Sequence, residues 1–181
     1  TGIAEMTTSL ARLMKNVCKG TAAQIPLKEE LDLVKDYFLI QQYRYGGSIT
    51  LDCRIESEEL YRCLIHRFTL QPENALFHGI EPKGCAGHIL LSAERVQSDR
   101  LGSVLQISVT DNGVGMSREQ IEKVLSAQSA PSADFFRQVG IHNVNQRIHY
   151  DFGEDYGISI DSVEGQYTTM TITLPYRLNE L

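Results

Sequence analysis

Two short segments of this chain carry side chains suited to binding a nucleotide. The first, residues 70–80, contains Asn74, and the second, residues 111–116, reads Asp-Asn-Gly-Val-Gly-Met. A carboxylate such as Asp111 can accept a hydrogen bond from an exocyclic amine, and glycines let backbone approach a flat ring where a Cβ would clash. An Asn amide oxygen is a hard, neutral ligand that Mg²⁺ takes alongside phosphate oxygens and water. A helix with Asn74, followed by a strand ending in Asp-x-Gly-x-Gly, therefore indicates a site for an adenine nucleotide and its metal.

Length and composition exclude several other classes of protein. A chain of 181 residues is one domain, or one domain with an appendage, and the net charge of −6 argues against nucleic acid or an anionic membrane as the main partner. No apolar run reaches the length of a membrane-spanning helix, and we expect no signal peptide. The four cysteines form no Cys-x-x-Cys pair, so they indicate reduced thiols in a cytosolic protein, not a zinc site or a disulfide framework: Cys18, Cys53, Cys63 and Cys85.

The elements that must position these residues begin with two helices. Apolar residues at helical spacing predict a helix over residues 3–18 and a second from Pro26 to about Arg44, ending at Gly46-Gly47. Their apolar stripes are typical of helix packing, and the packing partner can be a second copy of the chain. We expect the two helices to form an appendage separate from the rest.

The remainder of the chain alternates strands and helices. Apolar and polar residues alternate from Ile49 to Ile55, as in a half-buried strand, and Ser117 followed by Gln120 resembles a helix N-cap. The order predicts an α+β fold: a two-layer sandwich of a mixed, mostly antiparallel sheet with helices on one face, plus the N-terminal helices. The other expected elements are a helix at 70–79, a hairpin of strands 86–96 and 103–110, a helix to about Leu125, a mobile segment 126–132, a helix at 140–150, and strands 157–163 and 168–174.

Five segments of the chain resemble a known family. Glu-Asn-Ala-x-x-His-Gly at residues 73–79, Asp-x-Gly-x-Gly at 111–115 and Val-Gly-Ile-His-Asn-Val-Asn-Gln-Arg-Ile at 139–148 are similar to the N, G1 and G2 boxes of GHKL (Bergerat-fold) ATP-binding domains. The chain is most similar to the LytS/YesM-like sensor histidine kinases, whose linker helix resembles residues 27–45 and whose last strand resembles residues 168–175. The resemblance covers roughly residues 10–176.

This resemblance implies roles for individual residues. Asn74 would hold Mg²⁺ bridging the phosphates, Asp111 would read the adenine amino group, and Gly113 and Gly115 would shape the adenine wall. Gly140 would open the helix whose free N–H groups face phosphate. Residues 126–139 would form a lid over ATP. The other candidate ATP contacts are His78, Asn112, Met116, Arg137, Ile141, Asn143 and Thr168. Of these, His78 can instead cap its helix, and Arg137 can be a solvated side chain.

Glu73, next to Asn74, has two interpretations. It can orient a nucleophile or the water of the metal, and it can equally be a solvated acid. Phosphoryl transfer depends on positioning and charge neutralisation more than on covalent chemistry from the protein, so either role suits a kinase. Glu73 and Asn74 are the catalytic candidates.

The resemblance implies an ATP-binding catalytic domain of a two-component sensor histidine kinase. The γ-phosphoryl group of ATP would pass to a His on an upstream dimerisation helix, absent here, and then to a response regulator. Residues 1–46 would be the end of the dimerisation helix and the linker helix, and residues 47–181 the catalytic domain. We expect a homodimeric, membrane-anchored bacterial parent protein with this portion in the cytoplasm, Mg²⁺ as the metal, and no nucleic acid partner.

Two alternative functions follow from departures in the pattern. Gln138 stands where the G2 box usually has its first glycine, and Tyr167 where a later glycine is usual, which favours a nucleotide-binding regulatory module with little kinase activity. A hydrolytic GHKL ATPase would place a Glu four residues before Asn74, where this chain has Leu70. That residue argues against ATP hydrolysis.

Overall fold

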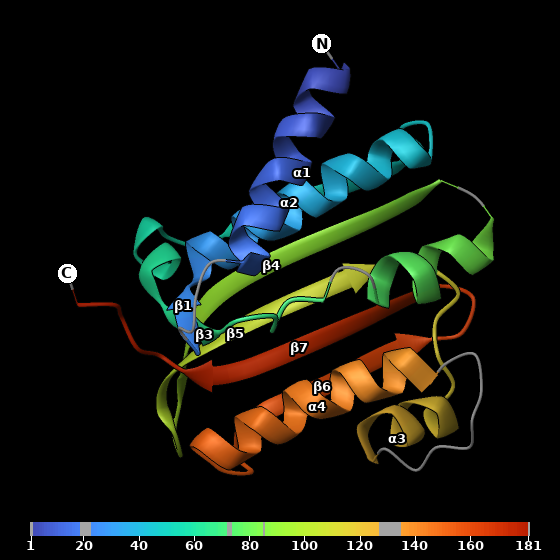
Figure 1. Cartoon of the computed structure of the whole chain (residues 1–181). Helices are drawn as coiled ribbons and strands as arrows, with labels where there is room; N and C mark the ends of the chain where they lie inside the picture. The colour runs from blue at the N-terminus through green and yellow to red at the C-terminus, as the bar shows by residue number, and fades with distance from the viewer. Residues whose placement is uncertain (1, 19–22, 72–73, 85, 127–134, 181) are drawn as a thin grey trace.

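A computed structural model describes residues 2–18, 23–71, 74–84, 86–126 and 135–180 of the chain. Helices and strands alternate, as expected, and Figure 1 shows them as two layers, with a sheet behind and helices in front. In chain order the elements are α1 (Gly2–Cys18), β1 (Gln24–Pro26), α2 (Leu27–Arg44), β2 (Ile49–Ile55), η1 (Glu58–Arg62), β3 (Leu64–His66), η2 (Asn74–Ile80), η3 (Glu81–Lys83), β4 (Gly87–Ser98), β5 (Gly102–Asp111), α3 (Arg118–Ser126), α4 (Phe135–Phe152), β6 (Gly157–Val163) and β7 (Tyr167–Pro175).

The main sheet has five strands in the order β2-β4-β5-β7-β6. β2 runs parallel to β4, and every other neighbouring pair is antiparallel. The helices α2, η2 and α4 lie across one face of this sheet (Figure 1). The predicted sandwich of a mixed, mostly antiparallel sheet with helices on one face is therefore confirmed.

Strand alternation separates a buried face from a polar face. On β5, Leu105 and Ile107 are fully buried under the helices. The opposite face carries hydroxyl residues that pair across strands: the hydroxyls of Thr110 and Thr169 lie 2.8 Å apart. Because these side chains bond to one another, the sheet can leave this face uncovered by helices.

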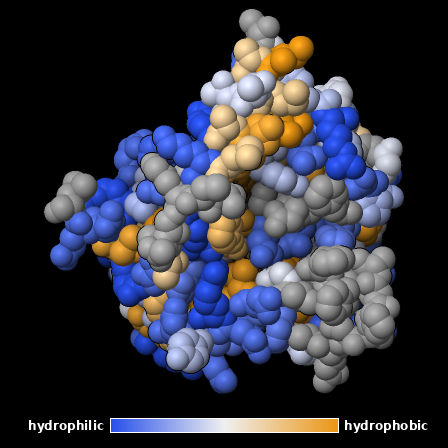
Figure 2. All heavy atoms as spheres, viewed as in Figure 1, coloured by the Kyte–Doolittle hydropathy of each residue, from blue (hydrophilic) through white to orange (hydrophobic). Residues whose placement is uncertain are grey.

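Helix α2 belongs to the core, and α1 stands outside it. Leu27 and Leu31 of α2 are buried in the same hydrophobic cluster as the strands. By contrast, α1 exposes Ile3, Leu10 and Met14. Figure 2 shows hydrophobic surface at the top of the molecule, where Figure 1 places α1. The expectation that both helices form a separate appendage is therefore wrong for α2. An apolar stripe indicates that a helix packs against something, but it does not identify the packing partner.

Most predicted elements are confirmed, but not all, and the short 3-10 helices η1 and η3 were not predicted. The predicted helix at 70–79 is a π-helix over Asn74–Ile80, and residues 72–73 lie outside the described part of the chain. The last helix begins at Phe135, five residues before the expected start at 140. The two-stranded sheet of β1 and β3 was not predicted, because three-residue strands show no periodicity.

Two smaller observations complete the fold. The predicted N-cap is confirmed: the hydroxyl of Ser117 accepts from the Gln120 N–H at 3.2 Å, and the Gln120 side chain accepts from the Ser117 N–H at 2.8 Å.

Over the described residues, the structure contains no helix with both the length and the apolar character needed to cross a bilayer.

Candidate nucleotide site

A narrow cavity of about 20 Å³ lies between the helices and the end of the central strands. It brings together four residues singled out in the sequence: Asn74, Asp111, Ile141 and Thr168. Its other lining residues, none of them predicted, are Gln71, Ala75, Val109, Ile160 and Met170. Because η2, β5, α4, β6 and β7 all contribute, the site depends on the whole sandwich and not on one motif.

Asp111 is the buried acid of this cavity. It ends β5 on the inward face, opposite Thr168 of β7, and is only 3% exposed. Its Oδ1 atom accepts a hydrogen bond from the Gly113 N–H at 2.9 Å, a local turn that fixes both the carboxylate and the following loop. A buried carboxylate held in this way can read a donor group on a ligand.

Glycines bring the loop after Asp111 against the end of η2. A Cβ on Gly113 would overlap the backbone of Gly79, and a Cβ on Gly79 would overlap the Asp111 carboxylate. The Val114 N–H donates to the Gly79 carbonyl at 2.9 Å, so two backbones meet directly. Gly115 has φ +70°, in the left-handed region, which favours glycine. The glycines therefore allow a close backbone contact beside Asp111, and the role of Gly113 and Gly115 as an adenine wall stays a prediction.

Asn74 opens the π-helix η2 and is 8% exposed. Its amide nitrogen Nδ2 donates to Oε1 of Gln71 at 2.8 Å. The same Oε1 atom lies 2.9 Å from the point where a Cβ on Gly140 would stand, so Gln71 fills the space between η2 and α4. The sequence offered one signal for this pair: two amide side chains three residues apart.

The other predicted site residues lie in different settings. The Met116 N–H donates to the Ser162 hydroxyl at 2.8 Å, which ties the glycine loop to β6. The Asn112 side chain accepts from the His88 N–H at 2.7 Å, so its oxygen is engaged in the fold at the start of β4. Asn143 is exposed on α4 and His78 is half-buried in η2. Their contacts with a nucleotide stay predictions.

Three predicted features involve residues, or a side chain, outside the described part of the chain. Glu73 lies outside the described residues, and so does most of the proposed lid, residues 127–134. Arg137 belongs to α4, but its side chain is not among those described. The prediction that Gly140 opens its helix is wrong, because α4 begins at Phe135. The N–H groups without helical partners belong to residues 135–138, the first turn.

The residues present fit an adenine nucleotide with its metal. A buried acid, Asp111, with the backbone of Gly79 close to its carboxylate suits a flat ring with an exocyclic amine. Among the described residues, no group of three or more His, Cys, Asp or Glu side chains could hold a metal. A metal here would bind one amide oxygen, that of Asn74, and complete its shell with phosphate and water, as Mg²⁺ does. A cavity of about 20 Å³ has room for about one water, so the walls must separate to admit a purine.

A second polar group of residues lies between α2, β3 and α4. We call it the polar layer: Glu30, His66, Thr69, Arg147 and Asp151. Glu30 accepts from the Leu70 N–H at 3.1 Å, and Arg147 donates to the Thr69 hydroxyl at 3.2 Å. Nε2 of His66 lies 2.5 Å from Oδ2 of Asp151. The layer therefore joins the N-terminal helix α2 to α4, through the segment that leads to Gln71.

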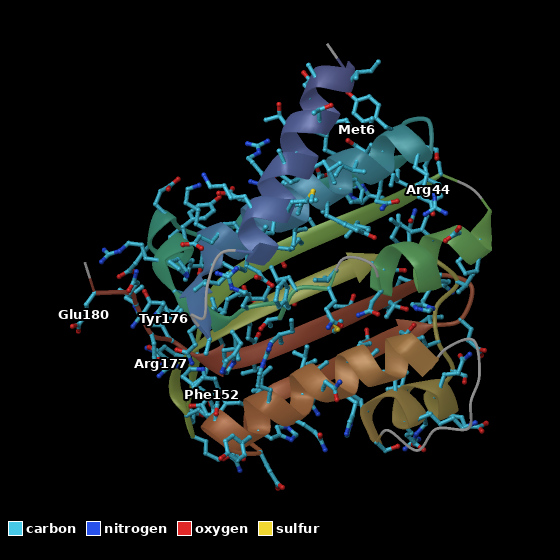
Figure 3. All side chains as sticks on the ribbon, viewed as in Figure 1. Met6, Arg44, Phe152, Tyr176, Arg177 and Glu180 are labelled. Atoms are coloured by element: carbon cyan, nitrogen blue, oxygen red, sulfur yellow. The ribbon has the colours of Figure 1, made fainter. Side chains whose placement is uncertain are left out.

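Burial sets the protonation of the polar layer. Glu30 is 2% exposed, and loss of solvation raises its pKa from 4.5 to about 7. Desolvation also lowers the pKa of His66, against the raising effect of Asp151. Phe152 closes the layer at the end of α4, with its ring 5.3 Å from that of His66 and the Arg177 guanidinium 4.8 Å above it (Figure 3).

Comparison with family models gives two matches. Residues 1–49 match a model described as histidine kinase, and residues 72–178 match the histidine kinase-, DNA gyrase B-, and HSP90-like ATPase model. The second match covers more than half of the chain and contains Asn74, Asp111 and Thr168.

Curated proteins of similar sequence carry consistent names. Sensor histidine kinase YesM of Bacillus subtilis (strain 168) is 32% identical over 179 residues, covering 97% of this chain and 28% of that protein. Sensor histidine kinase YpdA of Escherichia coli (strain K12) is 34% identical over 143 residues, covering 78% of this chain and 23% of that protein. The chain spans about a quarter of the length of these relatives.

Solved structures share the fold at low identity. The catalytic domain of histidine kinase ThkA in a nucleotide-free form has a TM-score of 0.59 at 18% identity, covering 84% of this chain and 94% of that one. The histidine kinase domain of a blue-light activated histidine kinase from Erythrobacter litoralis has a TM-score of 0.54 at 15% identity, covering 97% and 75%. Together with the family match over residues 72–178, these likenesses confirm the resemblance found in the sequence. The chain belongs to the histidine kinase-, DNA gyrase B- and HSP90-like ATPase family, and within it is similar to sensor histidine kinases.

Proposed function

We propose that this chain is the ATP-binding catalytic domain of a two-component sensor histidine kinase, and that its nucleotide binds in the cavity between η2, β5 and α4. The observation that carries the proposal is the Asp111 carboxylate, fixed at the end of β5 by Gly113 and enclosed with Asn74 in one cavity. Membership of an ATPase family supports ATP as the nucleotide.

Each residue then has a defined task. Asp111 accepts the adenine amine, and the backbone of Gly79 and Gly113 forms the wall beside the ring. Asn74 offers its amide oxygen to Mg²⁺, which neutralises phosphate charge when bound. Glu73 orients the incoming nucleophile or the metal's water. The remaining work is positioning, since phosphoryl transfer needs little covalent chemistry from the protein.

The acceptor and partners belong to the longer protein. We propose that the phosphoryl group passes to a His on an upstream helix and then to a response regulator, with residues 1–46 as the dimerisation and linker portion and residues 47–181 as the catalytic portion. The apolar stripe of α1, with Ile3, Leu10 and Met14 exposed, suits packing against a second copy in a homodimer. We also propose that this portion is cytoplasmic and that the longer protein is a membrane-anchored sensor; the relatives' names support the sensor role.

The alternative of a regulatory module with little activity rested partly on Tyr167. Its phenol donates to Asp161 on β6 at 2.8 Å, and Tyr167 does not line the cavity. The substitution therefore leaves the proposed adenine site open. The alternative of a hydrolytic ATPase is opposed by Leu70, which is 5% exposed in the hydrophobic core and has no group to activate water.

The first test replaces the adenine-reading acid. Asp111→Asn keeps the oxygen that Gly113 needs but presents a donor to the adenine amine. Loss of a charge-assisted hydrogen bond should lower ATP affinity more than tenfold, about 1.5–3 kcal/mol, measured by calorimetry. Asp99→Asn is the matched control, because Asp99 is an exposed acid in the turn at the opposite end of the β4–β5 pair. It should bind ATP as the unchanged protein does.

Two outcomes would contradict the proposal. Unchanged ATP affinity in a folded Asp111→Asn variant would reject the adenine role, and circular dichroism establishes folding. ATP binding without transfer of labelled phosphate to a supplied dimerisation domain would favour the regulatory alternative over the kinase.

A further inference from the structure

We propose that Gln71 is a positioning residue of the nucleotide site, which holds the Asn74 amide by its nitrogen and thereby directs the Asn74 oxygen toward the metal. The inference deepens the proposed function and rests on it. It assigns a task to a side chain that neither the motif comparison nor the family match singles out.

The first observation is the direction of the hydrogen bond. Nδ2 of Asn74 donates to Oε1 of Gln71 at 2.8 Å, and the two residues are also joined by a backbone bond from the Asn74 N–H to the Gln71 carbonyl at 3.1 Å. The oxygen and nitrogen of a primary amide lie on opposite sides of one carbon. With the nitrogen bound to Gln71, the oxygen is the end of the Asn74 amide left to bind a ligand.

Orientation matters because the two ends of an Asn amide have the same shape and opposite chemistry. The oxygen binds a cation, whereas the NH₂ group repels one. An unrestrained Asn74 would divide its time between both flips and among its χ1 rotamers. Only the fraction in the correct state binds metal, so the apparent affinity falls by that fraction.

The second observation is that Gly140 of α4 leaves room for the Gln71 amide. The Gln71 Oε1 atom lies 2.9 Å from the Cβ position of Gly140, a distance that real Cβ atoms essentially never show. Glycine at position 140 therefore leaves the space in which the Gln71 amide sits. Any side chain at 140 pushes on Gln71, and through it on Asn74. The position of α4 and the orientation of the proposed metal ligand are linked through one side chain.

The test separates the metal-dependent part of ATP affinity from the rest. ATP dissociation constants are measured by calorimetry in excess Mg²⁺ and in excess EDTA, and their ratio is the Mg²⁺ enhancement. Gln71→Met, similar in length but without an acceptor, should lower the enhancement about three- to tenfold, so that the affinity in Mg²⁺ falls more than the affinity in EDTA. Asn74→Ala should abolish the enhancement. Gln71→Glu, which can only accept, should keep it in both 0.1 M and 0.5 M salt, where charge effects are screened.

A direct readout uses the nucleotide-free protein. The side-chain NH₂ resonances of Asn74 should show one slowly exchanging proton, and Gln71→Met should remove that protection. Gly140→Ala should reduce the Mg²⁺ enhancement as Gln71→Met does, and should add nothing in the Gln71→Met background, because both changes act through the same amide.

The outcomes distinguish this inference from the proposed function. If the unchanged protein shows no ATP binding, the proposed function fails. If it binds ATP, and Asn74→Ala removes the Mg²⁺ enhancement while Gln71→Met does not, Gln71 has no positioning role. Equal losses in Mg²⁺ and in EDTA for Gln71→Met would show a purely structural role and overturn the inference. So would loss of the enhancement in Gln71→Glu at high salt.

Discussion

The candidate nucleotide site and the polar layer lie on the same side of the sheet, and they use polar groups in opposite ways. In the nucleotide site, Asp111 and Asn74 line a shared cavity, and Gly79 and Gly113 allow the backbone to pack closely beside Asp111. In the polar layer, side chains bond to one another, as Arg147 does with Thr69 and His66 with Asp151, although Glu30 Oε2, His66 Nδ1 and Arg147 Nε are buried without a hydrogen-bond partner among the described residues. The polar groups of the nucleotide site are therefore available to a ligand, whereas most of those in the polar layer are bonded within the protein.

This difference predicts different responses to mutation. Buried polar groups that already have protein partners contribute to stability, and removing one partner leaves the other unsatisfied. Groups that complete their bonding with a ligand contribute mainly to binding. Substitutions in the polar layer should therefore change the free energy of unfolding, and substitutions among the ligand-facing groups should change ATP affinity.

The largest expected effect is that of Gly113→Ala, which should change both stability and ATP affinity because Gly113 packs against backbone beside the site. Gly113→Ala would place a Cβ into the backbone of Gly79, which cannot move as a side chain can. We expect a loss of about 3 kcal/mol in the free energy of unfolding, at the upper end for overpacking, together with loss of ATP binding. Urea unfolding and calorimetry measure the two.

The control for Gly113→Ala is Gly102→Ala. Gly102 has φ +72° but nothing within 4 Å of its Cβ position, so this variant reports backbone strain alone, about 1–2 kcal/mol. It should bind ATP normally. A stable Gly113→Ala variant with full ATP affinity would show that the two backbones separate freely, and the glycine wall would lose its role.

The next effect concerns the pH dependence of the polar layer. Burial raises the pKa of Glu30 from 4.5 to about 7, so between these values the folded chain holds a proton that the unfolded chain has lost. The contribution of Glu30 to stability is complete below pH 4.5 and is lost as pH rises through 7. As pH rises through this window, the free energy of unfolding of the unchanged protein should fall by about 2–3 kcal/mol relative to that of Glu30→Gln.

The comparison with Glu30→Gln also controls for His66. The lowered pKa of His66 has the opposite sign, since stability gained from neutral His66 increases as pH rises toward 6.5. Both proteins contain His66, so its effect cancels in the difference. Parallel stability curves would mean that Glu30 is solvated in the folded chain and that the layer is not a closed polar cluster.

The fold was largely predictable because its signals are local. Alternation marked β2, and the Ser117 cap marked the start of α3. The start of α4 at Phe135 was missed although Asp134, a residue type favoured at N-caps, directly precedes it in the sequence, because Gly140 was taken as the start of the helix. The place of α2 in the core was missed for another reason: the apolar stripe from Leu27 to Phe38 is the same whether it meets a sheet or a second helix.

The part of the site that could be predicted consists of residues that belong to recognisable sequence motifs. Asp111 and Asn74 were singled out by their motifs, and the structure brings them to one cavity. Gln71 was missed because its contact with the Gly140 position exists only once η2 and α4 pack together. Glu30 and His66 were missed because they are distant in sequence from each other and from Arg147. Long-range pairing of polar groups leaves no periodic pattern in a sequence.

The smallest expected effect tests whether the two regions are independent. Thr69 is 1% exposed; its hydroxyl donates to the His66 carbonyl at 2.6 Å and accepts from Arg147. Thr69→Val keeps the shape and removes both bonds, which should cost about 1–2 kcal/mol in urea unfolding. ATP affinity should stay within twofold, because Thr69 does not line the cavity. A fivefold or larger change in ATP affinity would mean that the segment from His66 to Gln71 transmits a shift in the polar layer to Asn74. In that case the two regions would be one coupled unit, through which α2 could influence the nucleotide site.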